Sequence, residues 1–291
     1  MPELPDIDLY LEQLDKRIRG KRLLAVRVSK PFLLRSFDPP LSNADGRVVT
    51  EVRRIGKRVA IKLDPDNWLV LHLMVAGRLH WRTEPPKIGA RNQLASFDFD
   101  CGSLLLTEAG HKKRASLYLV VGDHELKAHD PGGIEPLECE FESFKMRLCS
   151  ENRTLKRALT NPHMFSGIGN AYSDEILHAA RLSPITLTSK LSADDCRKLY
   201  SAMRSVLRQW CDKLRDECGD EFPDNVTAFR PDMAVHGKFG MPCPVCDAPV
   251  QRIRYKSNET NYCARCQNGG RILADRSLSR LLKDNWPTAL D

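Results

Sequence analysis

The sequence predicts an α+β fold in three successive parts: an antiparallel β domain, a helical domain and a cysteine-rich β-hairpin module. Three observations predict it. Apolar runs typical of strands occupy residues 22–127, apolar residues at helical spacing occupy residues 140–217, and two C-x-x-C pairs lie between residues 243 and 266. Because strands and helices are segregated along the chain, we expect them to form separate domains.

The composition is that of an ordinary globular protein with two or three domains. Of the 291 residues, 42% are hydrophobic, and neither a run of eighteen apolar residues nor a signal peptide is found. We therefore expect a cytoplasmic protein without a membrane span. Lysine plus arginine exceed aspartate plus glutamate by 45 to 38, a net charge of +7. This charge is compatible with a polyanionic partner without requiring one, and the lack of paired interface motifs favours a monomer.

The predicted β domain is read from short apolar runs separated by turn-forming residues. The turns include "DPDN" and "CGS". The runs are rich in branched and aromatic residues, as strands are; they read "LLAVRVS", "RVAIKL", "WLVLHLMV", "SFDFD", "SLLLTE" and "ASLYLVV". This part of the chain therefore predicts a mostly antiparallel sheet structure.

The pattern changes to helical spacing after the glycine- and proline-rich loop "DPGGIEPLE". Helices are predicted in "FESFKMRLCS", "TLKRALTN", "NAYSDEILHAARL" and "ADDCRKLYSAMRSVLRQWCDKLRDE", and a short amphipathic tail helix in "LADRSLSRLLKDNW". We accordingly place domains at residues 1–132, 140–225 and 235–268, with a C-terminal tail helix within 269–291.

Four of the ten cysteines have the spacing of a zinc site. "CPVC" and "CARC" are separated by sixteen residues, enough for one β-hairpin to bring both pairs around a tetrahedral ion. A disulfide pair is disfavoured by the expected intracellular location, and a redox motif by the doubling of C-x-x-C. Four thiolates leave no open coordination position, so we expect one structural Zn²⁺ bound by Cys243, Cys246, Cys263 and Cys266.

Three polar stretches are candidates for binding phosphate. "HMFSGIGNAYSDEILHAARLSP" places two glycines and Asn170 before a helix, where backbone N–H groups and the helix dipole favour an anion; the alternative is a tight turn with Asn170 as an ordinary N-cap. Lys57 lies in a basic turn, where a solvated surface lysine is the ordinary interpretation. The run His111, Lys112, Lys113 and Arg114 is either a backbone-binding loop or a polar hairpin tip.

The ordered set of motifs resembles the Fpg/Nei family of DNA glycosylases with AP-lyase activity. The matching stretches are "MPELPDI", "GKR", "HLMVAGRL", "GIGNAYSDEILHAARLSP", "VHGKFGMPC" and the four-cysteine finger, from residue 1 to about 267. The resemblance implies an N-terminal antiparallel β-sandwich, a helical domain with a helix-two-turn-helix element and a zinc β-hairpin. It also implies that duplex DNA with damaged bases or abasic sites lies in a cleft between the halves, at the bacterial nucleoid.

The resemblance gives the first residues a chemical role. Removal of Met1 would leave Pro2 with a secondary amine, and α-amino groups have pKa values of about 7.7–8.0. Attack of this amine on C1′ of a damaged nucleotide displaces the base and forms an iminium ion, which permits strand cleavage by elimination. Glu3 resembles the family's acid/base residue. The alternative is that Pro2 is only the first-turn proline of a helix.

Other positions match residues that hold DNA in the family. Lys57, Lys156 and Asn170 are expected to contact phosphates, and the loop with Lys112, Lys113 and Arg114 to touch the backbone. Met74 matches a residue that fills the gap left by the displaced nucleotide, with an ordinary core methionine as the alternative. Glu175 is expected to support the site structurally.

Three departures from the family pattern indicate a divergent branch. Asn258 stands where an arginine usually contacts the phosphate next to the lesion; Arg252, Arg254 and Arg271 are candidate replacements. The loop "GHKKRAS" lacks the aromatic residue that the family commonly uses on the opposite strand, and Asp6 stands where a second glutamate is common. An altered lesion range, weaker base excision or a preference for open or bulky DNA would follow.

Three functions are therefore compared. The intact "PELP" favours a bifunctional glycosylase and AP lyase of base excision repair. The first alternative is a non-catalytic or weakly catalytic binder of damaged or distorted DNA, or a branch specialised for bulky or crosslinked lesions. A more distant alternative is a zinc-finger protein that binds RNA.

Overall fold

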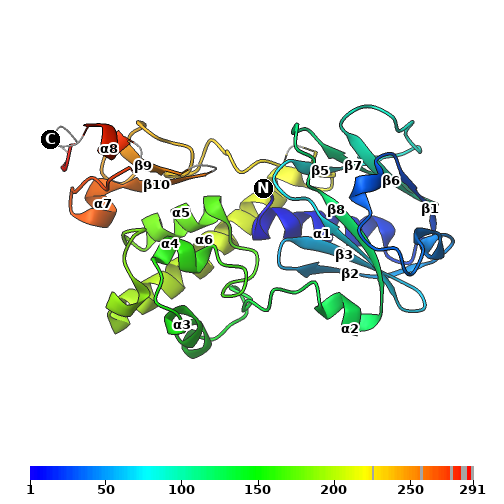
Figure 1. The fold of residues 1–291 in the computed structure, drawn as a ribbon, viewed down its shortest axis with the longest axis horizontal. Coiled ribbons are helices and arrows are strands. Elements are labelled where there is room, and N and C mark those ends of the chain that lie inside the picture. Colours follow the sequence, from blue (N-terminus) through cyan, green and yellow to red (C-terminus); the bar gives the residue numbers. More distant parts are fainter. Residues whose placement is uncertain (225, 256–257, 276–277, 283–286, 290–291) are drawn as a thin grey trace. The chain divides into compact units, whose positions relative to one another are not determined.

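A computed structural model describes the chain except for residues 225, 256–257, 276–277, 283–286 and 290–291 (Figure 1). The chain divides into two compact units. The first comprises Met1–Pro131 and Trp210–Thr227, and the second comprises Gly132–Gln209 and Ala228–Asp291. Within the described residues, no helix has the length and apolar character that crossing a membrane requires.

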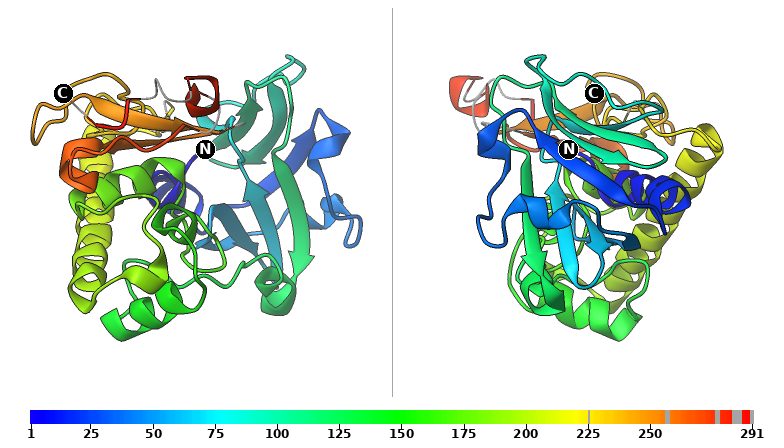
Figure 2. Two further views of the ribbon diagram at one scale, coloured as in Figure 1. Left: turned by 60° about the vertical axis from the view of Figure 1, so that its left-hand side comes forward. Right: turned by 90° about the vertical axis from the view of Figure 1, so that its right-hand side faces the viewer.

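The first unit contains two four-stranded antiparallel sheets, seen from two further sides in Figure 2. One sheet has the order β2-β3-β4-β8 and the other the order β1-β6-β7-β5. This arrangement confirms the predicted antiparallel β-sandwich. The strands are β1 (Leu23–Val28), β2 (Val49–Ile55), β3 (Arg58–Leu63), β4 (Asn67–His72), β5 (Gly77–Arg82), β6 (Gln93–Phe99), β7 (Gly102–Glu108) and β8 (Ser116–Val121).

The core of this unit lies between the two sheets. Alternate positions of β3 and β4 bury Val59, Ile61, Leu69 and Leu71, and the facing sheet contributes apolar residues to the same cluster. Helix α1 (Leu4–Ile18) lies against β2 and β3 and adds its apolar stripe: Ile7, Tyr10, Leu14 and Ile18. Each such side chain contributes about 1.5–3 kcal/mol when fully buried. The start of α1 is therefore held firmly.

The first turn of α1 is defined by a reciprocal cap. Glu3 is the N-cap residue, and its backbone N–H donates to the Asp6 carboxylate at 2.9 Å. Pro5 occupies the first turn, where a missing N–H costs nothing. The Asp6 side chain, shorter than the glutamate common at this position, therefore caps the first turn of α1.

Helices are the main regular elements of the first segment of the second unit, Gly132–Gln209. They are α3 (Phe141–Cys149), α4 (Leu155–Leu159), α5 (Asn170–Ala179) and the first part of α6 (Ala193–Cys218); the shorter α2 (Gly122–Lys127) belongs to the first unit. Single 3₁₀ turns lie at Pro31–Leu33, Leu41–Ala44 and Thr188–Lys190. The ring of Phe144 lies 5.3 Å from those of both Phe165 and Tyr200. This aromatic cluster packs α3 against α6.

The cysteine-rich module is the expected β-hairpin. Strand β9 (Val250–Arg254) pairs antiparallel with β10 (Glu259–Cys263), followed by α7 (Ala264–Asn268) (Figure 1). Helix α8 (Leu278–Leu282) falls in the predicted tail helix, the rest of which lies partly outside the described residues. The domain limits at 132, 140, 225, 235 and 268 stay predictions, and residue 225 is also outside the description.

A tight turn of residues 73–77 joins β4 to β5. The Gly77 N–H donates to the Leu73 carbonyl oxygen at 2.9 Å, and Met74 adopts the left-handed conformation with φ of 53°. A Cβ atom at Gly77 would lie 2.2 Å from that same oxygen. The turn therefore requires glycine at position 77.

Replacing Gly77 by alanine is expected to lower the free energy of unfolding by more than ~1 kcal/mol, because the turn must open to admit the new methyl group. Thermal and urea unfolding of Gly77→Ala measure this. Gly89→Ala is the matched control, since its Cβ would meet nothing within 4 Å. Equal stability of the two variants would show that the turn tolerates a side chain.

Candidate functional site

The amino terminus lies within electrostatic reach of Lys57 and Arg78. Pro2 and Glu3 precede α1 and are buried, with only 2% of Glu3 exposed. Burial lowers the pKa of the Met1 amino group, and the Glu3 carboxylate opposes this effect. The positive charges of Arg78 and Lys57 lower the same pKa further. An amine that is more often unprotonated at neutral pH is a better nucleophile, so this position suits covalent chemistry.

Arg78, whose charge acts on the amino terminus, is hydrogen-bonded to the turn that carries Met74. Its Nη1 atom donates to the carbonyl oxygens of Gly77 at 2.6 Å and Val75 at 3.2 Å, and its Nε atom donates to the carbonyl of Val226. No sequence pattern predicted the contact with Val226, because that residue lies 148 positions away. Arg78 therefore fixes the turn and the segment after α6 together.

Met74 is half-buried within that turn and does not belong to the buried core. Its neighbour Val75 is 59% exposed. A left-handed conformation is uncommon for a residue with a side chain, and such backbone strain is concentrated at binding and catalytic sites. The turn thus presents Met74 and Val75 as an apolar tip, rather than using Met74 as core filling.

The basic loop after β7 is organised around Glu108. The buried Glu108 carboxylate accepts backbone N–H groups from Arg114 at 3.0 Å and Ala115 at 3.2 Å, and Lys113 donates to the Glu108 carbonyl. Lys112 and Arg114 are exposed. Of the predicted cations, Lys113 therefore holds the loop, while Lys112 and Arg114 extend from it.

Lys156 is committed to a buried ion pair in the second unit. Its Nζ atom donates to the Asp174 carboxylate at 2.5 Å and to the Asn170 carbonyl at 2.6 Å. The same carboxylate contacts His236 Nδ1 at 2.8 Å and Asn261 Nδ2 at 3.4 Å. Paired charges of this kind tolerate burial because each compensates the other. Lys156 and Asn170 are therefore brought together, with Lys156 bracing the first turn of α5.

Asn170 is the first residue of α5, and Gly169 occupies the N-cap position. The Asn170 side-chain amide donates to the Glu259 carbonyl on β10 at 2.9 Å, so it joins the helix to the hairpin instead of capping it. Glu175, one turn later, accepts N–H groups from the segment before the finger. The three donors, at 2.7–2.9 Å, are Ala234, Val235 and His236.

Burial raises the pKa of the Glu175 carboxyl, and the three backbone donors oppose that rise. These three hydrogen bonds are of the kind that a structural role for Glu175 needs. Residues 234–236 of the segment before the finger are thereby tied to α5.

The hairpin tip carries Asn258, which is exposed and whose carbonyl accepts the Tyr255 N–H at 2.8 Å. Among the candidate replacements for the absent arginine, Arg252 stacks its guanidinium 4.1 Å from the Phe239 ring centroid. Arg254 is exposed at the end of β9, next to the tip. Arg271 is also exposed, beyond α7. Of the three, Arg254 lies nearest in the hairpin to Asn258.

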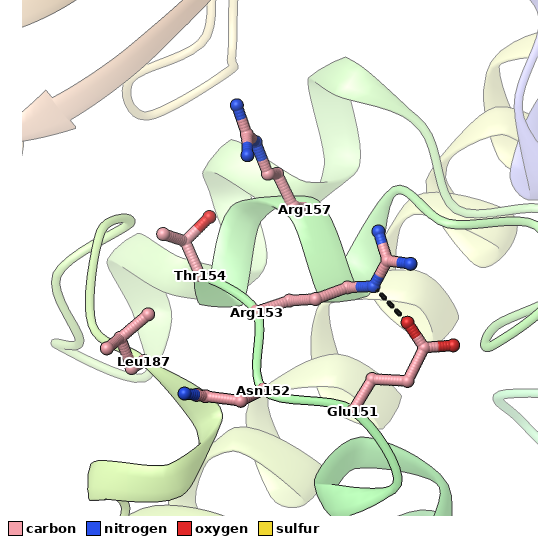
Figure 3. A pocket seen from close by; sticks show the side chains of 6 residues that line it. All are labelled: Glu151, Asn152, Arg153, Thr154, Arg157 and Leu187. Atoms are coloured by element: carbon pink, nitrogen blue, oxygen red, sulfur yellow. Dashed lines mark hydrogen bonds and ion pairs between the residues drawn. The ribbon is translucent and has the colours of Figure 1, made fainter.

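A polar pocket lies at the start of α4 (Figure 3). Arg153 forms an ion pair with Glu151 in its wall, so the carboxylate neutralises one of the two arginines there. Arg157 extends away from that pair. The full lining is Glu151, Asn152, Arg153, Thr154, Arg157 and Leu187. The charged residues of the lining therefore leave a net charge of only +1, which argues against a strong anion site.

The four predicted zinc ligands converge, with all sulfur atoms within 4.8 Å of one another. Tetrahedral coordination at Zn–S distances of about 2.3 Å places sulfurs about 3.8 Å apart. Three of the separations, from 3.4 to 3.9 Å, are close to that value. Cys243, Cys246, Cys263 and Cys266 therefore fit a structural Zn²⁺, as predicted, and the ion would hold the two knuckles of the hairpin together.

His178 contacts this centre from α5. Its Nε2 atom lies 3.3 Å from Cys243 Sγ, and burial lowers the pKa of His178, which favours the neutral ring. A neutral ring with its proton on Nε2 donates to the thiolate. No sequence pattern predicted this contact, because a single histidine in a helix is most often an ordinary packed or surface residue. Hydrogen bonds of this kind orient metal ligands and tune their basicity.

Three family models match successive parts of the chain. They are the formamidopyrimidine-DNA glycosylase N-terminal domain at residues 1–114, the formamidopyrimidine-DNA glycosylase H2TH domain at 133–214 and a zinc finger found in FPG and IleRS at 240–269. A formamidopyrimidine-DNA glycosylase of Heliobacterium modesticaldum is 32% identical over 282 residues, covering 92% of this chain and all of the relative. The chain belongs to the formamidopyrimidine-DNA glycosylase family.

Solved structures of the formamidopyrimidine-DNA glycosylase family share the fold. MutM (Fpg) from Thermus thermophilus is 29% identical, with a TM-score of 0.76 over 91% of this chain and 98% of that one. Fpg from Lactococcus lactis, in a complex with DNA containing an abasic site, is 22% identical, with a TM-score of 0.80 over 91% and 99% of the two chains. The resemblance found in the motifs and the predicted helix-two-turn-helix element are confirmed.

Removing the imidazole at position 178 is expected to weaken zinc binding. His178→Phe deletes the N–H that contacts Cys243, and loss of such a contact typically costs about tenfold or more in metal affinity. Competition with a chromogenic chelator measures it. His178→Gln, which retains a donor, should recover part of the loss, and His124→Phe, at an exposed position on α2, is the control. Zinc affinity equal to the control would contradict a role for the contact.

Proposed function

We propose that the protein is a bifunctional DNA glycosylase and AP lyase of base excision repair, with Pro2 as nucleophile after removal of Met1. The observation that carries this proposal is the setting of the amino terminus. It precedes a capped, buried helix start, and burial together with nearby cations lowers the pKa of the Met1 amine; we expect the same surroundings to act on the Pro2 amine one residue later. A surface terminus would have neither feature.

The proposed reaction begins with attack of the unprotonated Pro2 nitrogen on C1′ of the damaged nucleotide. The base leaves with its bonding electrons, and the nitrogen is left as an iminium joined to the opened sugar. Glu3, next to the nucleophile, protonates the sugar ring oxygen and then moves protons during elimination of the phosphate. Lys57 holds a phosphate beside the lesion while its charge favours the neutral amine.

The proposed partner is duplex DNA with damaged bases or abasic sites, bound by a monomer in the bacterial cytoplasm. The related Fpg from Lactococcus lactis was solved with DNA containing an abasic site, which supports this choice. We assign backbone contacts to Lys112, Arg114 and Asn258, and gap filling to Met74. Lys156 and Asn170 would present the first turn of α5 to a phosphate, with Lys113 ordering its loop.

The alternative is a non-catalytic or weakly catalytic binder of damaged, distorted or crosslinked DNA. It is favoured by Asn258, which offers no positive charge at the exposed hairpin tip. The two functions differ in one product, because only the lyase forms a covalent bond to DNA.

Borohydride reduction of a mixture with abasic-site duplex DNA is expected to trap a covalent complex. Trapping should be lost in Pro2→Gly, and Glu3→Gln should slow base release on damaged duplex about 100-fold or more. Pro85→Gly, at an exposed proline, is the control. Mass spectrometry of the active protein should show Met1 absent. A wild-type protein that binds the duplex without a reducible adduct would establish the alternative instead.

Arg78 is expected to set the pH dependence of trapping. Its charge lowers the pKa of the Met1 amine, and under the proposed function it acts in the same way on the Pro2 amine. Arg78→Gln should therefore raise the pKa of the Pro2 amine and leave less neutral amine at pH 7. The acid limb of the trapping rate should therefore move to higher pH. Arg78→Lys keeps the charge and should keep the limb in place, as should the control Arg82→Gln. An unmoved limb in Arg78→Gln would exclude this electrostatic role.

A further inference from the structure

A pocket of about 380 Å³ lies in the segment that leads to the zinc finger. It belongs entirely to the second unit, and neither the zinc centre nor the proposed covalent chemistry uses it. Its wall contains one phenylalanine, one histidine and two cationic residues. The full lining is Phe229, Arg230, Pro231, His236, Gly237 and Lys238.

The aromatic wall of the pocket is built on a rigid support. The Phe229 ring is stacked on His236, with centroids 5.5 Å apart and planes 21° apart. The Nδ1 atom of His236 lies 2.8 Å from the Asp174 carboxylate. The backbone N–H of His236 donates to the Glu175 carboxylate at 2.9 Å. Although Phe229 is fixed on one side by this stack, 70% of it is exposed.

Gly237 permits the close approach of the Phe229 ring. A Cβ atom at this position would lie 2.9 Å from Phe229 Cδ1, and the backbone has a φ of 71°. Any other residue would push the ring away or strain the chain. Glycine at position 237 is therefore required for the observed position of the exposed Phe229 ring.

Cations accompany the exposed aromatic residues of this region. Arg230 and Lys238 line the pocket, and Phe239, which is 49% exposed, lies under the Arg252 guanidinium at 4.1 Å. Aromatic faces interleaved with positive charge are the surface that single-stranded nucleic acid requires, because its bases stack and its phosphates need cations. A paired base does not offer its face, whereas an unpaired base does.

We propose that this pocket binds an unpaired base of single-stranded DNA, stacked on Phe229, with Arg230 and Lys238 contacting the flanking phosphates. The choice of DNA rests on the proposed function, and the pocket extends that function to open DNA.

Fluorescence anisotropy of a labelled single-stranded oligonucleotide of thymidines tests the pocket. Phe229→Ala should weaken binding about tenfold or more, the usual cost of losing one base-stacking partner. Phe229→Trp, which keeps an aromatic face, should bind like the wild type. Phe37→Ala, at a phenylalanine that is 88% exposed in the first unit, is the matched control. Zinc content and circular dichroism verify that each variant is folded.

Three outcomes would overturn the proposal: equal single-strand affinity of Phe229→Ala and Phe37→Ala, an equal loss on undamaged duplex, or tighter Phe229-dependent binding of the matching RNA strand. Borohydride trapping of the wild type on abasic duplex tests the proposed lyase separately. A protein that fails to trap and yet loses single-strand binding in Phe229→Ala supports the pocket alone. A protein that traps normally and is indifferent to Phe229→Ala supports the lyase alone.

Discussion

The buried carboxylate of Asp174 is the interaction on which the second unit depends. It is fully inaccessible to solvent, and desolvating such a charge costs several kcal/mol unless partners compensate it. Lys156, His236 and Asn261 supply that compensation from three separate parts of the chain. One carboxylate thus fixes α4, the segment before the finger and the hairpin against α5. Without it, Lys156 would be a buried cation lacking its counter-ion.

In the first unit, the main constraint is that the amino terminus is held in a defined position. Termini are usually mobile, but α1 inserts four apolar side chains into the core of the sandwich, and the Glu3–Asp6 cap begins the helix at a defined residue. Arg78 then links the amino terminus, the Met74 turn and Val226. The proposed covalent chemistry needs this order, because a nucleophile must be held at a defined distance from its substrate.

Local patterns predicted the parts of this structure that local forces determine. Apolar runs typical of strands predicted β1, β3, β4, β6, β7 and β8 but did not single out β2 or β5; helical spacing predicted α3 to α6, and C-x-x-C pairs predicted the zinc ligands. Contacts between distant positions were not predictable: His178 meets Cys243 across 65 residues and Lys156 meets Asp174 across 18. A lysine in an amphipathic helix is usually a surface cation. Nothing in "TLKRALTN" indicates that Lys156 is buried and paired with Asp174.

The departures from the family pattern at Asn258 and in the loop at 109–115 can be considered together with the exposed aromatic rings of the second unit. Position 258 carries asparagine and the loop at 109–115 has no aromatic residue, so under the proposed function two contacts with duplex DNA would be weaker than the resemblance implies. Exposed aromatic rings with adjacent cations lie instead at Phe229 and Phe239, on either side of His236 in the chain. Stacking depends on unpaired bases, whereas phosphate clamps act equally on paired ones. The two proposals therefore fit together: a chain with fewer phosphate clamps and more stacking surface would discriminate open from closed DNA while keeping the proposed nucleophile at its buried terminus.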